Sequence, residues 1–192
     1  REMLDKLAYK SQQRAAKATR EGFFKSIIPI QNPVKKRTIT QDECIRGSIS
    51  LEQLAELPPA FAELGNSGVD ALQLSEHPHL TKIVHVHTAG NSPSMADAAA
   101  LVLLGDEALQ ENLKKAPAAR VLAVATTCND PLQVVSGCTA ATAKLMYEQN
   151  ITVKDIDLFE IHEAFAATII ACQRELNIRS DKLNVNGGVI AM

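Results

Sequence analysis

The chain has 192 residues, of which 46% are hydrophobic and 22% charged, and its formal net charge is −2. These values are typical of one sizeable globular domain or two small ones. The near-neutral charge argues against binding to nucleic acid or to a membrane surface, and no apolar run reaches the roughly 20 residues of a membrane span. We expect no signal peptide.

The first part of the chain combines one long helix with irregular segments. Hydrophobic and small residues at helical spacing predict a helix over residues 2–21. Its small-residue face contains Leu4, Leu7, Ala8, Ser11, Ala15 and Ala18. Residues 24–30 are predicted to form a strand, and the basic cluster at 35–37 a solvated loop, with a phosphate or adenine contact as the alternative.

A second helical segment follows at residues 51–64. Pro58 and Pro59 should interrupt it, because proline removes a backbone donor and clashes with the preceding turn. The run Gly-Asn-Ser-Gly at residues 65–68 predicts a turn.

From residue 82 onward the pattern becomes regular, and predicted strands alternate with predicted helices. The strands are expected at 83–88, 98–104, 120–125 and 156–161, and the helices at 106–115, 132–149 and 163–177. The run at 98–104 is wholly apolar, which is typical of a buried strand. Such alternation predicts an α/β sheet with helices on its faces and a boundary near residue 81.

Cysteines and histidines offer weaker indications. The four cysteines are far apart, so neither a zinc site nor a disulfide framework is indicated, and a reducing, cytoplasmic compartment is expected. Cys138 and Cys172 fall on helical stripes and are interpreted as structural thiols; a hydrolase that uses Cys138 as its nucleophile is the alternative. His85 and His87 share one strand face, but no third ligand completes a metal site, so no metal is expected.

Three short motifs carry residues that could serve catalysis or binding. Residues 88–91 read T-A-G-N, residues 160–167 read E-I-H-E-A-F-A-A, and residues 184–192 read N-V-N-G-G-V-I-A-M. His162 follows a predicted strand and precedes a predicted helix, where open α/β sheets bind their ligands. Taken alone, the three motifs could also be an Asx turn, a helix cap and a hairpin turn.

In order and spacing, these motifs resemble the thiolase family, with its T-A-G-N turn, N/H-E-A-F-A loop and glycine-rich C-terminal signature. The resemblance covers nearly the whole chain. It implies an α/β, thiolase-like fold, in which two similar halves with five-stranded sheets carry a loop domain over coenzyme A. Residues 1–81 would be part of the loop domain, and residues 82–192 most of the C-terminal α/β half.

The resemblance also implies individual roles. His162 would bind the thioester carbonyl oxygen, where a fixed donor stabilises the negative charge that develops during acyl transfer. Arg46 would lie near the nucleotide of coenzyme A, and Ala60 and Phe61 against its adenine or pantetheine part. Further contacts to substrate or coenzyme A are implied for Ala89, Asn91, Ser92, Ala164, Phe165, Asn186, Gly187 and Gly188.

The implied reaction is acyl transfer between 3-ketoacyl-CoA and coenzyme A, as thiolysis or as the reverse Claisen condensation, through an acyl-cysteine. Coenzyme A is then a substrate, and no cofactor is expected. No cysteine here matches the family nucleophile, so we expect that residue upstream of Arg1, and the Gly-His-Pro motif and second cysteine downstream of Met192. The 192 residues alone should then be inactive.

The family also implies a homodimer or homotetramer whose partners are acyl-CoA and coenzyme A. Two departures from the family pattern support an alternative. Pro93 follows Ser92 where the family has a second small residue, and Ala98 replaces the glycine of a later Asp-Gly pair. A non-catalytic thiolase-like protein that binds acyl-CoA or lipid is therefore the second hypothesis.

Overall fold

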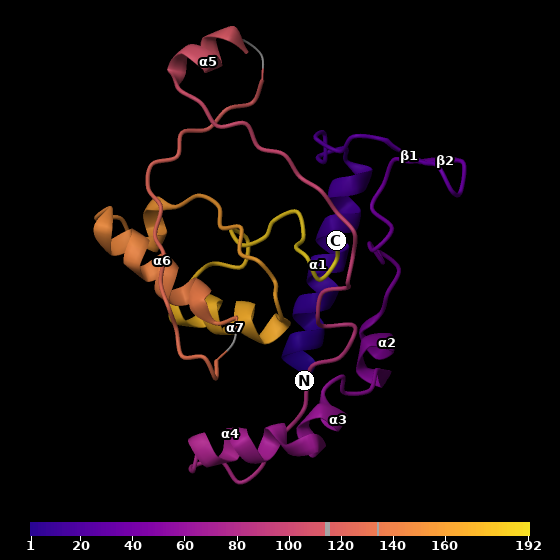
Figure 1. Ribbon diagram of the computed structural model, residues 1–192, viewed down its shortest axis with the longest axis vertical. Helices are drawn as coiled ribbons and strands as arrows, with labels where there is room; N and C mark the ends of the chain where they lie inside the picture. Colours follow the sequence, from indigo (N-terminus) through magenta and orange to yellow (C-terminus); the bar gives the residue numbers. More distant parts are fainter. Residues whose placement is uncertain (114–115, 134) are drawn as a thin grey trace.

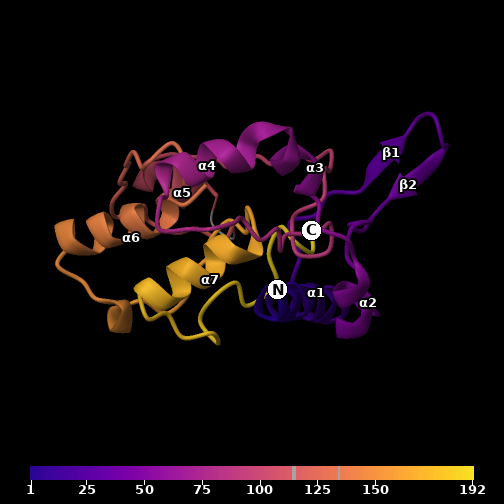
Figure 2. The ribbon, with the colours of Figure 1, turned by 90° about the horizontal axis from the view of Figure 1, so that it is seen from below.

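Helix α1 (Glu2–Arg20) is the longest element of the computed structural model, which describes residues 1–113, 116–133 and 135–192. Helices α2 (Leu51–Glu56) and α7 (Ala166–Glu175) pack against α1, and α6 (Gly137–Glu148) packs against α7. A hairpin of β1 and β2, and helix α5 on two extended arms, project from this group of helices (Figure 1). Figure 2 shows α3 and α4 on the side opposite α1 and α2.

The remaining elements are short. Strands β1 (Ile30–Asn32) and β2 (Arg37–Ile39) pair antiparallel, with Ile30 opposite Ile39. The short helices are α3 (Ala62–Leu64), the π-helical turn η1 (Gly65–Val69), α4 (Asp70–Glu76), α5 (Glu107–Asn112) and the 3₁₀ turn η2 (Val153–Asp155). Among the described helices, none combines the length and the apolar composition needed to cross a membrane.

The small-residue face predicted for α1 is confirmed, and it determines how closely other segments approach the helix. Its buried members are Leu4, Ala8, Ser11, Ala15 and Ala18. Gly187, with φ +89°, lies so close that a Cβ atom added there would be 2.8 Å from the backbone nitrogen of Ala15. Larger side chains on either side would push the C-terminal loop away from α1.

Two hydrophobic clusters join segments that are distant in sequence. The first brings together α1, α2, α7 and the C-terminal loop through Leu4, Ala8, Leu54, Ala166 and Ile190. The second joins α7 to the segments before and after it through Phe159, Ile169, Cys172, Ile178 and Leu183. Both clusters lie beside the loop at residues 160–165, which carries His162.

The helix predictions are confirmed with narrower bounds. Within residues 2–21, Glu2–Arg20 form α1. The segment 51–64 is broken at its prolines into α2 and α3, and the three later helices are α5, α6 and α7. The helix predicted at 106–115 ends at Lys114 and Lys115, which lie outside the described residues. The helical stripe that contains Cys138 also includes Val134, which lies outside them as well. The other members of this stripe are half-buried rather than buried: Cys138, Ala141 and Leu145.

Of two predictions in the first part, the strand was wrong and the turn holds in part. Of the strand expected at 24–30, only Ile30 is paired, because the ladder begins there and closes around the basic cluster. The turn expected at 65–68 is a kink inside a helical stretch, because η1 contains Gly68 in a non-helical conformation and leads directly into α4. Gly68 permits this kink with φ +122°, a conformation that residues with a Cβ atom rarely adopt.

The strands predicted after residue 82 were also wrong as paired elements. Segments 98–104 and 120–125 run extended and lie in solvent, with Leu101 98% and Leu122 81% exposed. Segment 83–88 is extended without a ladder, and 156–161 contributes one parallel bridge, from Phe159 to Leu183. A strand needs a neighbour to accept and donate its backbone hydrogen bonds. These four segments have no ladder within the described residues.

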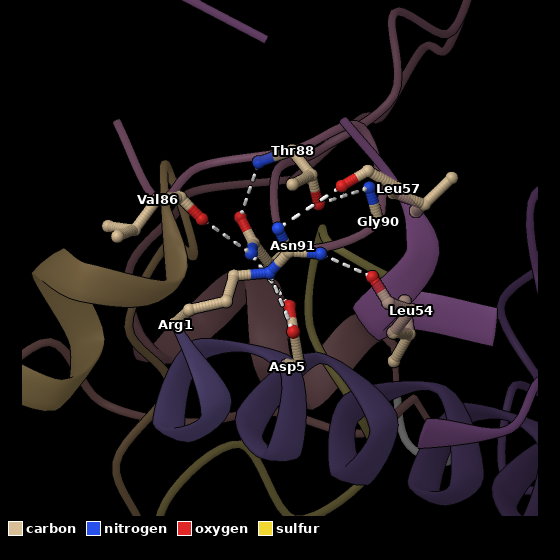
Figure 3. A network of polar contacts seen from close by, with 8 residues as sticks. All are labelled: Arg1, Asp5, Leu54, Leu57, Val86, Thr88, Gly90 and Asn91. Carbon is tan, nitrogen blue, oxygen red and sulfur yellow. Dashed lines mark hydrogen bonds and ion pairs between the residues drawn. The ribbon is translucent and has the colours of Figure 1, made fainter. Parts of the chain in front are cut away.

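Asn91 is the polar centre of the structure and ties the T-A-G-N turn to α1 (Figure 3). Its side chain is fully buried; Oδ1 accepts from the backbone N–H of Thr88 (2.9 Å), and Nδ2 donates to the carboxylate of Asp5 (2.8 Å) and the carbonyl of Val86 (3.2 Å). Arg1 pairs with the other oxygen of Asp5 at 2.7 Å and donates to the carbonyls that end α2. The turn, α1 and α2 are thereby joined.

Replacing Asn91 with alanine should destabilise the chain severely. The change removes the partner of the Thr88 N–H and of Oδ1 of Asp5 in a buried site, at about 1–3 kcal/mol for each group, although Arg1 still pairs with the other oxygen of Asp5. Urea denaturation followed by circular dichroism measures the loss. Asn112→Ala, at the exposed end of α5, is the control and should change stability little. Equal midpoints for the two variants would contradict the role of Asn91.

Cys172 makes stability depend on alkaline pH. Burial raises the pKa of its thiol from 9.0 to about 11, so above pH 9 the unfolded chain loses a proton that the folded chain keeps. Stability should therefore fall as the pH rises from 9 towards 11. The urea midpoint measured across this range should decline less steeply for Cys172→Ala than for the unaltered chain. Parallel declines would show that Cys172 does not contribute.

Candidate active site

The T-A-G-N turn and the H-E-A-F loop meet at the first turn of α7. The backbone N–H of Ala166 donates to the carbonyl oxygen of Asn91 at 3.2 Å. The side chain of Asn91 holds the turn to α1, while its main chain caps α7. Two motifs that are far apart in sequence are therefore fixed to one another.

His162 is exposed, but the residues on both sides of it are firmly held. The Asn184 side chain accepts from the N–H of Ile161 (2.8 Å) and donates to the carbonyl of Ile161 (2.9 Å). Glu163, on the other side, is only 3% exposed. The imidazole thus projects into solvent from a backbone that has little freedom.

The carboxylate of Glu163 joins three segments. It accepts from the Ser11 hydroxyl at 2.8 Å, from the Asn184 amide at 3.1 Å and from the backbone N–H of Ile190 at 3.2 Å. Ser11 in turn accepts from the N–H of Gly188 at 2.9 Å. A buried carboxylate is tolerated when donors surround it. This one connects α1, the loop of His162 and the glycine-rich C-terminal loop.

The glycine-rich loop fits this arrangement only without side chains. A Cβ atom at Gly188 would lie 2.3–2.7 Å from the carboxylate of Glu163. Asn184 supplies the loop's hydrogen bonds to Ile161 and Glu163, whereas Asn186 is half-buried. The sequence prediction named Asn186, Gly187 and Gly188. It missed Asn184 and Glu163, although both stand inside the quoted motifs.

Three rings gather beside the junction, and we call Phe61, His87 and Phe165 the aromatic set. Phe61 meets Phe165 edge-on, with ring centroids 5.7 Å apart, and His87 lies against Phe165 at 4.9 Å. The backbone N–H of Ala60 donates to the carbonyl of His87 at 2.9 Å. The predicted pair Ala60 and Phe61 is therefore brought to the predicted Phe165, and His87 was missed as a member.

Two buried polar atoms beside the turn have no hydrogen-bond partner within the described residues. They are Nε2 of His87 and Oγ of Ser92. A buried unsatisfied group costs about 1–3 kcal/mol, so such atoms need an explanation. Burial also lowers the pKa of His87, which keeps its ring neutral at pH 7.

The other predicted residues are less closely connected. Ala89 is exposed at the tip of the turn, and Ala164 is half-buried in the loop before α7. Arg46 is exposed, and its backbone N–H donates to the side chain of Gln12 on α1. Asn91 uses its side chain within the protein. It does not form the Asx turn given as the alternative, because Oδ1 accepts from the N–H of Thr88, three residues earlier, and not from the N–H two residues on.

Histidines do not gather around a metal position. His85 pairs with Asp70 at 2.9 Å, and His77 lies against His79. Across residues 1–113, 116–133 and 135–192, no group of three His, Cys, Asp or Glu side chains could hold a metal ion. A hollow of about 440 Å³ lies beside α5, and its lining includes none of the predicted site residues.

Comparison with known proteins points to one family. The family model for the N-terminal domain of thiolase matches residues 1–108, and that for the C-terminal domain matches residues 115–192. The acetyl-CoA acetyltransferase of Synechocystis sp. is 36% identical over 98% of this chain and 43% of its own length. The human mitochondrial 3-ketoacyl-CoA thiolase is 33% identical over 100% of this chain and 44% of its own.

Solved structures agree with the sequence matches. The Bacillus anthracis acetyl-CoA acetyltransferase superposes with a TM-score of 0.79 at 30% identity, covering 99% of this chain and 44% of that one. The dimeric peroxisomal thiolase of Saccharomyces cerevisiae gives 0.78 at 30% identity, over 100% and 44%. The chain spans less than half the length of these relatives. The predicted α/β, thiolase-like fold class is confirmed, and the chain belongs to the thiolase family.

Proposed function

We propose that this chain serves acyl transfer between 3-ketoacyl-CoA and coenzyme A, as thiolysis or as the reverse Claisen condensation. In thiolysis a cysteine thiolate attacks the 3-keto carbon, and the bond between C2 and C3 breaks. Acetyl-CoA leaves after C2 takes a proton, and the thiol of coenzyme A then receives the acyl group from the cysteine. Relatives named acetyl-CoA acetyltransferase and 3-ketoacyl-CoA thiolase support this reaction.

The observation that carries the proposal is the hydrogen bond from Ala166 to the carbonyl of Asn91. This hydrogen bond holds the loop that carries His162 against the turn and the aromatic set. In the proposed reaction His162 donates to the thioester oxygen of the acetyl-CoA part, where charge develops as the bond between C2 and C3 breaks. Phe61 and Phe165 provide the apolar surface for the pantetheine arm.

The cysteine that accepts the acyl group is not assigned within the described residues. Burial raises the pKa of Cys172 to about 11, which leaves it protonated at neutral pH. Burial, followed by the charge of Asp42, raises the pKa of Cys44 as well. The absence of acyl-transfer turnover in the 192 residues alone stays a prediction.

Assembly and location belong to the same proposal. A homodimer or homotetramer is supported by the dimeric yeast relative and by the exposed apolar segments 98–104 and 120–125. A cytoplasmic location is supported by the four free cysteines, although the human relative is named as mitochondrial.

The role of His162 is tested by two ligands that differ in one carbonyl group. Isothermal titration calorimetry of the unaltered chain should show binding of both acetyl-CoA and coenzyme A. His162→Ala should weaken acetyl-CoA about two- to tenfold, the worth of one hydrogen bond. The affinity for coenzyme A, which has no thioester oxygen, should not change.

Two outcomes would contradict these expectations. A chain that binds neither ligand would refute the proposed function. Equal losses for both ligands in His162→Ala would show that the ring does not recognise the carbonyl. The non-catalytic acyl-CoA binder would be favoured by a third outcome. In that case His162→Ala weakens acetyl-CoA alone, but the natural protein catalyses no acyl transfer.

Glu163 should be needed to hold the His162 loop. In Glu163→Gln an amide group faces the donors of Ser11, Asn184 and Ile190, so at least one donor loses its partner, at about 1–3 kcal/mol. Urea denaturation measures the loss. Glu160→Gln, in the same loop but exposed, is the matched control and should stay within about 0.5 kcal/mol of the unaltered chain. Similar losses in both variants would refute this role of Glu163.

A further inference from the structure

His87 combines two internal contacts with one ring atom that has no partner in the described part of the chain. Its ring lies against Phe165, its carbonyl accepts from Ala60, and its Nε2 atom is buried without a partner in the described part of the chain. The side chain therefore lies among the residues proposed for the pantetheine arm. It brings to them a polar atom that the folded chain leaves unused.

The charge state of this ring restricts what it could recognise. Burial lowers the pKa of His87, so at pH 7 the imidazole is neutral. A neutral ring has one N–H donor and one acceptor nitrogen, which match an amide better than a phosphate. Its neighbours Phe61 and Phe165 are apolar. The surroundings thus suit an uncharged, partly apolar ligand segment.

We propose that His87 Nε2 forms a hydrogen bond with an amide group of the pantetheine arm, and so makes the site selective for ligands that carry this arm. This inference rests on the proposed function, because it takes the aromatic set as the place where that arm lies. Phe61, which is 37% exposed and meets Phe165 edge-on, is a member of the aromatic set that reaches solvent. Ser92 Oγ, the second unpartnered atom beside the turn, offers the arm another partner.

The test uses two ligands that share a nucleotide and differ in the arm. Coenzyme A and adenosine 3′,5′-bisphosphate, which has no pantetheine, are titrated calorimetrically into the unaltered chain and into His87→Phe. Phenylalanine keeps the aromatic contact with Phe165 but has no ring nitrogen. The variant should bind coenzyme A about tenfold more weakly and the bisphosphate equally well. His79→Phe, an exposed histidine of the same region, should change neither affinity.

Thermal stability supplies the second readout. Because Nε2 has no partner in the folded chain, His87→Phe should melt at the same or a higher temperature than the unaltered chain. A lower melting temperature would show that the nitrogen has an internal partner and would overturn the inference. Unchanged affinity for coenzyme A would overturn it as well. If the unaltered chain bound no coenzyme A, the proposed function itself would fail, and this inference with it.

Discussion

The fold depends on one buried amide. Asn91 binds α1 through Asp5, closes its own turn through Thr88, and offers its carbonyl to the first turn of α7. Because all these groups are buried, each must find a partner within the protein. The side chain and the main chain of one residue thus fix three segments at once. These hydrogen bonds also fix the position of the loop that carries His162.

A second polar centre completes the frame on the other side of the loop. Glu163 gathers donors from α1 and the C-terminal loop, and Gly188 leaves the space that the carboxylate occupies. The first hydrophobic cluster also joins α1, α7 and the C-terminal loop, so apolar packing and these hydrogen bonds act on the same segments. His162 stays outside this network and reaches solvent. Such an arrangement suits a donor that must stay in place while charge develops nearby.

Much of the site could be predicted from the sequence, but the sheet could not. The motifs at 88–91 and 160–167 are local patterns, and α7 (Ala166–Glu175) lies within the helix predicted at 163–177. The apolar runs at 98–104 and 120–125 indicate the environment that a strand prefers, yet pairing depends on a neighbour that a local pattern does not reveal. The roles of Glu163 and His87 in the site were not predicted, because these roles depend on the burial of their polar atoms. The burial of a charged or polar side chain cannot be predicted from its residue type or its spacing in the sequence.

The central claim is that the turn and the start of α7 are held together by the carbonyl of Asn91. Amide hydrogen exchange at Ala166, followed by NMR in the unaltered chain, tests it most directly. The account predicts strong protection of this N–H, comparable to that of the amide of Thr88, since both donate to Asn91. Exchange of the Ala166 amide at the rate of an unstructured peptide, with Thr88 still protected, would contradict it.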